Sequence, residues 1–222
     1  MRFTIFVFLF CFCFRYVNAQ DEFVLSLDSI KNIKTTRYSS INEVGIGIHV
    51  AGKRISKFSA NPQKRKMDLE KPSFIFRSVH GALINPKFFI GAGVGIDYTA
   101  IGNSGNRNSN FTFPIFIECR EYFLKGNFNV FLSQRVGAAF FIDSYSQGGY
   151  NNGKYSGFFG AFQVGGRYVT SGKKLAIHFG VGYRLQHLQR KLDLLFNGTG
   201  IPNRTTVITI KHYVPIVLGV TF

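Results

Sequence analysis

The chain has 222 residues and carries 27 lysines and arginines against 11 aspartates and glutamates, a formal net charge of +16. This length is enough for one domain, and no apolar stretch after the N-terminal segment reaches the roughly 18 residues of a transmembrane helix. The basic balance indicates a polyanionic partner, but an export signal at the N-terminus argues against nucleic acid.

The first residues have the plan of a secretory signal peptide. Arg2 precedes an apolar run from Phe3 to Phe14, and Val17-Asn18-Ala19 supplies the small-x-small pattern of a cleavage site. We therefore expect residues 1–19 to be removed by cleavage after Ala19. Residues 20–42 are polar, and we expect them to form a periplasmic lead segment. The mature chain is then either soluble or crosses a membrane as a β-barrel.

Eight later segments have the alternating pattern or the composition of β-strands. Most are near the roughly 10 residues that a tilted membrane strand needs, and helical periodicity is not convincing anywhere. The sequence therefore predicts an all-β fold, an eight-stranded antiparallel up-and-down transmembrane β-barrel over residues 43–222. The predicted strands are residues 43–51, 73–84, 88–98, 111–123, 128–143, 155–169, 175–187 and 205–222.

The seven connections between these segments alternate between long and short. "NPK", "LKGN" and "TSGKK" are short, whereas the connections between them, such as "SYSQGGYNNGK", are long. Outer-membrane barrels have short periplasmic turns and longer external loops, with both chain ends on the periplasmic side. The connections thus favour the bacterial outer membrane, with a short-turn end in the periplasm and a long-loop end outside.

The segment "FFIGAGVGIDY" at residues 88–98 has glycine at every second position. Glycine in a strand marks a sharp bend or a close approach of another group. The interior of an eight-stranded barrel is just filled by side chains. We therefore expect Gly91, Gly93 and Gly95 to face the interior and make room for larger side chains, while the apolar even-numbered residues face lipid.

Charged residues on the predicted inward faces form a candidate luminal network. If the "LKGN" turn is tight, Glu118 lies nearly opposite Ser133 and diagonal to Arg135, and Arg77 can approach Asp97. Buried charges need partners because an unpaired one is costly. We favour a stabilising role for these pairs over a proton or ion path. The network comprises Arg77, Asp97, Glu118, Arg120, Arg135, Arg167 and Arg184.

The first long connection is rich in cations. It predicts an external collar that contacts lipopolysaccharide phosphates, to which ammonium and guanidinium groups are suited. The alternative is a solvated loop whose charges only aid solubility. The candidate contacts are Lys53, Arg54, Lys57, Lys64, Arg65 and Lys66.

Two stretches resemble a known family. "FTFPIFIECREYFLKGNFNVFLSQRVGAAF" at residues 111–140 and "YVPIVLGVTF" at residues 213–222 resemble the central hairpin and the terminal strand of Bacteroidota outer-membrane barrels. That group includes PorT-like proteins and is similar to small barrels of the OmpA and OmpX type. The resemblance implies a small outer-membrane barrel whose aromatic terminus, here Phe222, is read by the barrel-assembly machinery. It also implies envelope secretion proteins as partners of some members.

Catalytic motifs do not stand out. A lipid-modifying enzyme would need a nucleophile and a base that meet on the outer face, and the sequence offers no convincing set. Ser78 and His80 share the side of the strand at residues 73–84 that we assign to lipid. We expect no cofactor, no metal and no enzymatic activity. The predicted function is a structural or interaction role in the cell envelope, with a lipid-modifying enzyme or a narrow solute channel as alternatives.

Overall fold

The computed structural model describes residues 36–57, 62–66, 72–101, 108–123, 126–143, 155–170, 175–194 and 203–222. Every regular element within these ranges is a β-strand. No helix in the described part of the chain is long and apolar enough to cross a membrane. The predicted signal peptide and residues 20–35 of the predicted lead segment lie outside the described residues.

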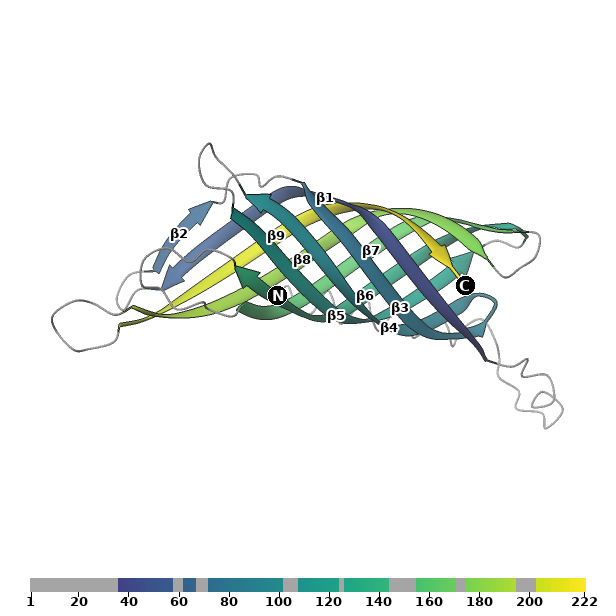
Figure 1. Cartoon of the computed structure of the whole chain (residues 1–222), viewed down its shortest axis with the longest axis horizontal. Coiled ribbons are helices and arrows are strands. Elements are labelled where there is room, and N and C mark those ends of the chain that lie inside the picture. Colours follow the sequence, from purple (N-terminus) through teal and green to yellow (C-terminus); the bar gives the residue numbers. More distant parts are fainter. Residues whose placement is uncertain are drawn as a thin grey trace. The chain divides into compact units, whose positions relative to one another are not determined.

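Eight of the nine strands close into an antiparallel barrel. Each strand from β3 to β9 pairs with the next one along the chain, β3 also pairs with β1, and β9 pairs back with β1. Figure 1 shows these strands running obliquely side by side. The predicted eight-stranded β-barrel is thus confirmed. The strands are β1 (Arg37–Lys57), β2 (Pro62–Lys66), β3 (Ser73–Asn85), β4 (Phe88–Ile101), β5 (Asn108–Phe123), β6 (Phe128–Asp143), β7 (Tyr155–Val169), β8 (Ala176–Leu194) and β9 (Asn203–Thr221).

The largest difference from the predicted strands is at β1. It begins at Arg37 rather than at residue 43, so the barrel takes up residues that we had assigned to the lead segment. The reason lies in β3, which pairs with β1 over nearly its whole length, from Arg37 opposite Leu83 to Gly47 opposite Ser73. The stretch "RYSSIN" at residues 37–42 is mostly polar. A strand is recognised from alternating apolar and polar residues, and this stretch does not show that pattern, so the start of β1 was not predicted.

The short strand β2 was not predicted. β1 continues beyond Gly47, its last residue paired with β3, and the continuation pairs with β2 from Lys53 to Lys57. The long connection between the first two barrel strands therefore contains a basic hairpin, which we define as residues 53–57 of β1 together with β2.

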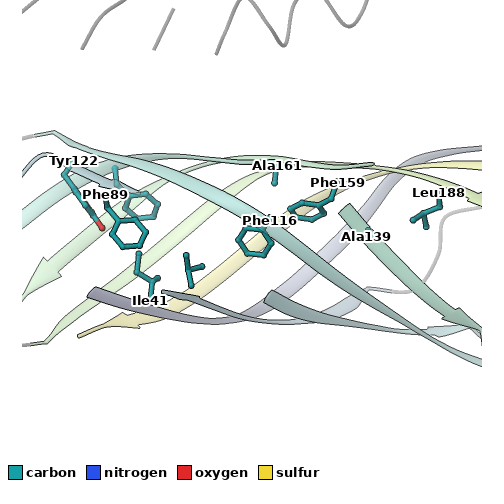
Figure 2. Close-up of a cluster of buried hydrophobic side chains, with 10 residues drawn as sticks. Ile41, Phe89, Phe116, Tyr122, Ala139, Phe159, Ala161 and Leu188 are labelled. Atoms are coloured by element: carbon teal, nitrogen blue, oxygen red, sulfur yellow. The ribbon is translucent and has the colours of Figure 1, made fainter. Parts of the chain in front are cut away.

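The glycine face of β4 points inward, as predicted. A Cβ at Gly93 would lie 2.7 Å from ring atoms of Phe116, and one at Gly95 would lie 3.1 Å from Cγ of Arg77. Figure 2 shows Phe116 and Phe159 among the apolar side chains that fill the barrel. The glycines thus leave space for large side chains from other strands, which suits the narrow interior of an eight-stranded barrel.

The outward face is apolar. Alternate positions of the barrel strands carry mostly hydrophobic side chains that are exposed or half-buried, including Phe74 at 66% and Val94 at 55% exposure. A soluble barrel would bury these residues and expose the charged ones, whereas this barrel does the reverse. The arrangement is that of a lipid-facing surface.

We expect the folded barrel to migrate faster than the unfolded chain in a denaturing gel unless it is boiled. β1 and β9 close the sheet along a register that runs from Ile41 opposite Thr221 to Lys57 opposite Thr206, so no strand edge is left for detergent to open. Comparing heated and unheated samples in detergent tests this. A single band position, together with a soluble monomer in detergent-free buffer, would contradict a membrane barrel.

Candidate functional site

A cluster of charged side chains crosses the lumen of the barrel. Glu118 of β5 accepts hydrogen bonds from Arg120 Nε at 2.8 Å, from Ser133 Oγ at 2.8 Å and from Arg135 Nε at 2.9 Å. Glu43 of β1 accepts from Arg120 Nη2 at 2.8 Å and, through both its oxygens, from Arg135 Nη2 at 2.7 Å. All these side chains are buried. Two carboxylates and two guanidinium groups thus form one ion cluster, which gives each carboxylate charge-assisted partners.

This cluster joins opposite walls of the barrel. In the order β1-β3-β4-β5-β6-β7-β8-β9, the strand β6 stands halfway around from β1. Arg135 of β6 nevertheless contacts Glu43 of β1 directly, at 2.7 Å. His178 of β8 also contacts this carboxylate, with its Nε2 at 3.2 Å from Glu43 Oε1. Direct ion pairs therefore span the lumen between opposite walls.

A second bridge crosses the lumen between β4 and β8, which also stand opposite each other in the strand order. Arg184 Nη1 donates to Asp97 Oδ2 at 2.7 Å, and Gln186 Nε2 reaches the same oxygen at 3.4 Å. Both members of the ion pair are buried. The two bridges use different pairs of strands, so they brace the barrel along two directions.

The luminal arginines also stack on aromatic rings. Arg120 lies 4.4 Å from the ring centroid of Phe131, and Arg184 lies 4.3 Å from that of Tyr213. Such cation–π contacts strengthen when the cation is removed from water. Aromatic side chains therefore act both as filling and as partners for the cations.

The structure brings most of the predicted network together but changes its pairing. Glu118 stands directly opposite Arg135 in the register, and Arg120 rather than Glu118 stands opposite Ser133. Asp97 pairs with Arg184 instead of Arg77. The turn geometry, which had to be assumed from the sequence, sets these partners.

Two predicted members lie outside the ion pairs. Arg77 is fully buried beside Phe159, with its guanidinium carbon 5.8 Å from the ring centroid. Arg167 is partly exposed and lies 4.5 Å from the ring centroid of Tyr122. Their contacts are aromatic rather than ionic.

Glu43 was missing from the predicted network although it is central to it. It precedes Gly45 and Gly47 on the inward face by steps of two, so extending the alternation backward would have found it. It was missed because residue 43 was taken as the start of the strand. The contact of His178 with Glu43 could not be predicted, because β1 and β8 are far apart in sequence.

The basic hairpin sets cations opposite cations. Lys53 is paired with Lys66, and Arg54 is paired with Arg65. Lys53 and Arg54 are exposed. Directly opposed like charges destabilise an antiparallel pair. Lys64 stands opposite Ile55 and Lys57 opposite Pro62 in the same two strands.

The C-terminal residue is tied into the sheet. The backbone groups of Phe222 and Ser40 exchange hydrogen bonds of 2.9 and 3.1 Å, and Ser39 Oγ donates to the Phe222 carbonyl at 3.0 Å. The aromatic side chain of Phe222 is exposed. Phe222 therefore lies where the last strand, β9, pairs with the first strand, β1.

Comparison with solved structures places the fold among outer-membrane barrels. The outer membrane protein OprG from Pseudomonas aeruginosa superimposes with a TM-score of 0.57 and 12% identity, covering 84% of this chain and 97% of that one. The outer membrane protein AlkL, solved in lipid bilayers, gives 0.50 and 11%, covering 84% and 90%. A weaker likeness, at 0.44 and 10%, is to the outer membrane protease OmpT from Escherichia coli, with 86% and 100% covered.

No family model matches the sequence, and no curated protein matches it. At such low identity the solved structures show the fold alone.

Proposed function

We propose that this chain is a small barrel of the bacterial outer membrane with a structural or interaction role in the envelope. The observation that carries the proposal is the bracing of the lumen by Glu43–Arg135 and Asp97–Arg184 between opposite walls, together with the apolar outer face. The likeness to OprG and AlkL supports the same location. The bridged lumen argues against the alternative of a narrow solute channel.

The interaction surface in this proposal is the basic hairpin, and its partner is lipopolysaccharide. The hairpin joins β1 to β3 through a long connection, so in the predicted topology it lies outside, where lipopolysaccharide phosphates are dense. Phosphate groups between the paired cations would offset their repulsion. Binding of this kind weakens as salt screens the charges.

Charge reversal on one strand of the hairpin tests this proposal. In the Lys53→Glu/Arg54→Glu variant, each new carboxylate stands opposite a cation of β2, so the hairpin itself is expected to gain cross-strand pairs. We expect the variant to fold normally but to retain less lipopolysaccharide than the wild type during purification at low salt. The difference in retention between the two proteins should shrink at high salt, because the wild type also releases lipopolysaccharide there.

The matched control is Arg37→Glu/Lys87→Glu, which changes the net charge equally at two exposed positions of the short-turn end. This control should retain lipopolysaccharide as the wild type does. Equal retention in all three proteins at both salt concentrations would leave the hairpin a passive charged surface.

Protease added to intact cells should cut the long connection near Lys64 and spare the turn at residues 86–87. Cleavage confined to that turn would invert the topology.

A finer version of the proposal follows from the resemblance to PorT-like Bacteroidota barrels, and it makes the protein an accessory of protein secretion. Residues 20–42, a predicted lead segment apart from its last residues in β1, would then contact envelope partners in the periplasm. Crosslinking in the native envelope followed by copurification tests this version. Recovery of the barrel-assembly machinery alone would argue for a protein that is assembled there and has no secretion role.

A further inference from the structure

A hydrogen-bonded polar cluster lies on the outer face of β1 and β3, within a largely apolar belt. Along β3, Ser78 and His80 alternate with the inward Arg77 and Val79, so both point outward. Phe76, the preceding outward residue, is exposed. Polar groups are costly on a lipid-facing surface and are usually functional there.

The cluster is an ordered chain of contacts. The Tyr38 hydroxyl lies 2.6 Å from His80 Nδ1, and His80 Nε2 lies 3.0 Å from Ser78 Oγ. The rings of Tyr38 and His80 are stacked, with centroids 6.2 Å apart. The Ser78 hydroxyl donates a hydrogen bond to Asn42 Oδ1 at 2.8 Å, and it turns to His80 Nε2 when the amide of Asn42 rotates. We define Tyr38, Asn42, Ser78 and His80 as the outer polar cluster.

This order is that of an orienting group, a base and a nucleophile. A serine becomes nucleophilic when a base within about 2.6–3.2 Å accepts its proton and a third group orients that base. If His80 Nδ1–H donates to the Tyr38 oxygen, the lone pair of Nε2 faces Ser78. Tyr38 and Asn42 were hidden from sequence reasoning because residues 20–42 were assigned to the lead segment.

We propose that the outer polar cluster is a hydrolytic site for carboxylic esters of membrane lipids, which approach sideways from the bilayer. His80 is exposed, and Tyr38 is 66% exposed. The neighbours of His80 in this part of the sheet include Ala82 and Ala92, whose small side chains leave the imidazole open to lipid. Tyrosine at the edge of the apolar belt is typical of the membrane interface. This activity does not rest on the lipopolysaccharide contact.

The reaction follows the two steps of serine-dependent acyl transfer. Ser78 Oγ attacks the acyl carbonyl carbon while its proton passes to His80 Nε2. The carbon–oxygen bond to the lipid alcohol then breaks, and the alcohol leaves with that proton. A water molecule next attacks the acyl-serine, giving a proton to Nε2, and the fatty acid leaves as the proton returns to Ser78 Oγ.

Asn42 offers the donor for the developing oxyanion. It stands directly opposite Ser78 in the register of β1 and β3, and its side-chain amide is already in contact with Oγ. Rotation of the amide by half a turn brings Nδ2–H to the serine side. Such a donor can stabilise the negative charge of the tetrahedral intermediate. The backbone amides here belong to the sheet ladder.

Covalent labelling of the purified barrel in detergent tests the nucleophile. An alkyl fluorophosphonate forms a phosphonyl-serine and releases fluoride only when the serine is activated. We expect labelling of the wild type, no labelling of Ser78→Ala, and labelling of His80→Gln slowed by about 100-fold or more. Tyr38→Phe keeps the ring and removes the hydroxyl, and it should slow labelling and move its pH profile. All variants should keep the heat-dependent gel shift of the folded barrel.

The matched control is the second outward Tyr–His pair, Tyr183 and His212, whose hydroxyl and Nδ1 are also in contact. His212 stands opposite Leu185 and Ala51 in the register, and neither of these is a serine. Tyr183→Phe and His212→Gln should leave labelling and its pH profile unchanged.

Fatty-acid release identifies the substrate source. Phospholipid vesicles and purified lipopolysaccharide are each incubated with the wild type and with Ser78→Ala. Serine-dependent release from either lipid supports the site and names its source. Release from neither, or equal release by Ser78→Ala, overturns the proposal whatever the labelling shows.

Discussion

Replacing Glu118 with alanine is expected to destabilise the barrel by about 3–5 kcal/mol, the usual cost of removing one partner from a buried ion pair. Glu118 accepts hydrogen bonds from Arg120, Ser133 and Arg135, and none of these side chains can turn to water. Without Glu118, two guanidinium groups share the single carboxylate of Glu43. Glu118→Gln should lose most of the same free energy, because it removes the charge but keeps the volume.

A double-mutant cycle separates the pair from the rest of the cluster. Removing Glu118 and Arg135 together leaves Glu43 paired with Arg120, which lie 2.8 Å apart, so the charges balance again. The double variant should therefore cost less than the sum of the two single variants. Denaturant titrations of the folded gel band provide the free energies. Strict additivity would contradict a coupled cluster.

The control for this cycle is Glu121→Ala, on the outward side of the same strand. Its effect should stay within about 0.5 kcal/mol, as for most surface substitutions. A loss as large as that of Glu118→Ala would mean that the strand, and not the ion cluster, responds to the substitution.

The second large effect is expected for Gly93→Leu, with a loss of about 1–3 kcal/mol or more from overpacking. A Cβ at this position would lie 2.7 Å from two ring atoms of Phe116 and 3.0 Å from Cγ2 of Val79. The rest of the leucine side chain would need further space in a lumen that is already filled. The free energy of unfolding in detergent measures the effect.

Two variants make this prediction specific. Val94→Leu adds a methylene one position along β4, but its side chain faces outward and is 55% exposed, so we expect about 0.5 kcal/mol or less. Phe116→Ala should partly rescue Gly93→Leu, since it removes the ring that the new side chain meets. Equal losses for Gly93→Leu and Val94→Leu would show that the glycine face is not needed for packing.

Local patterns in the sequence were enough for the eight-stranded barrel and for the inward faces of several strands, but not for the start of β1 or for β2. The alternation in residues 128–143 and 155–169 gave the bounds of β6 and β7 as the structure has them. Hydrophobic period and connection length are properties of neighbouring residues, so a single sequence records them. The same alternation placed Glu118, Arg120 and Arg135 on inward faces, but the assumed hairpin register put Glu118 opposite Ser133, where the structure has Arg120.

Only the tertiary structure decided which side chains meet. Glu43 and Arg135 are 92 positions apart, and Arg184 and Asp97 are 87 apart. Such contacts depend on the strand order, on the register of every hairpin and on the width of the lumen together. The outer polar cluster could not be predicted for the same reason. Tyr38 contacts His80 only because β1 begins at Arg37 and its first residues pair with β3. The sequence determined a barrel with a polar interior, and closure of the sheet decided that the opposite walls are joined by ion pairs.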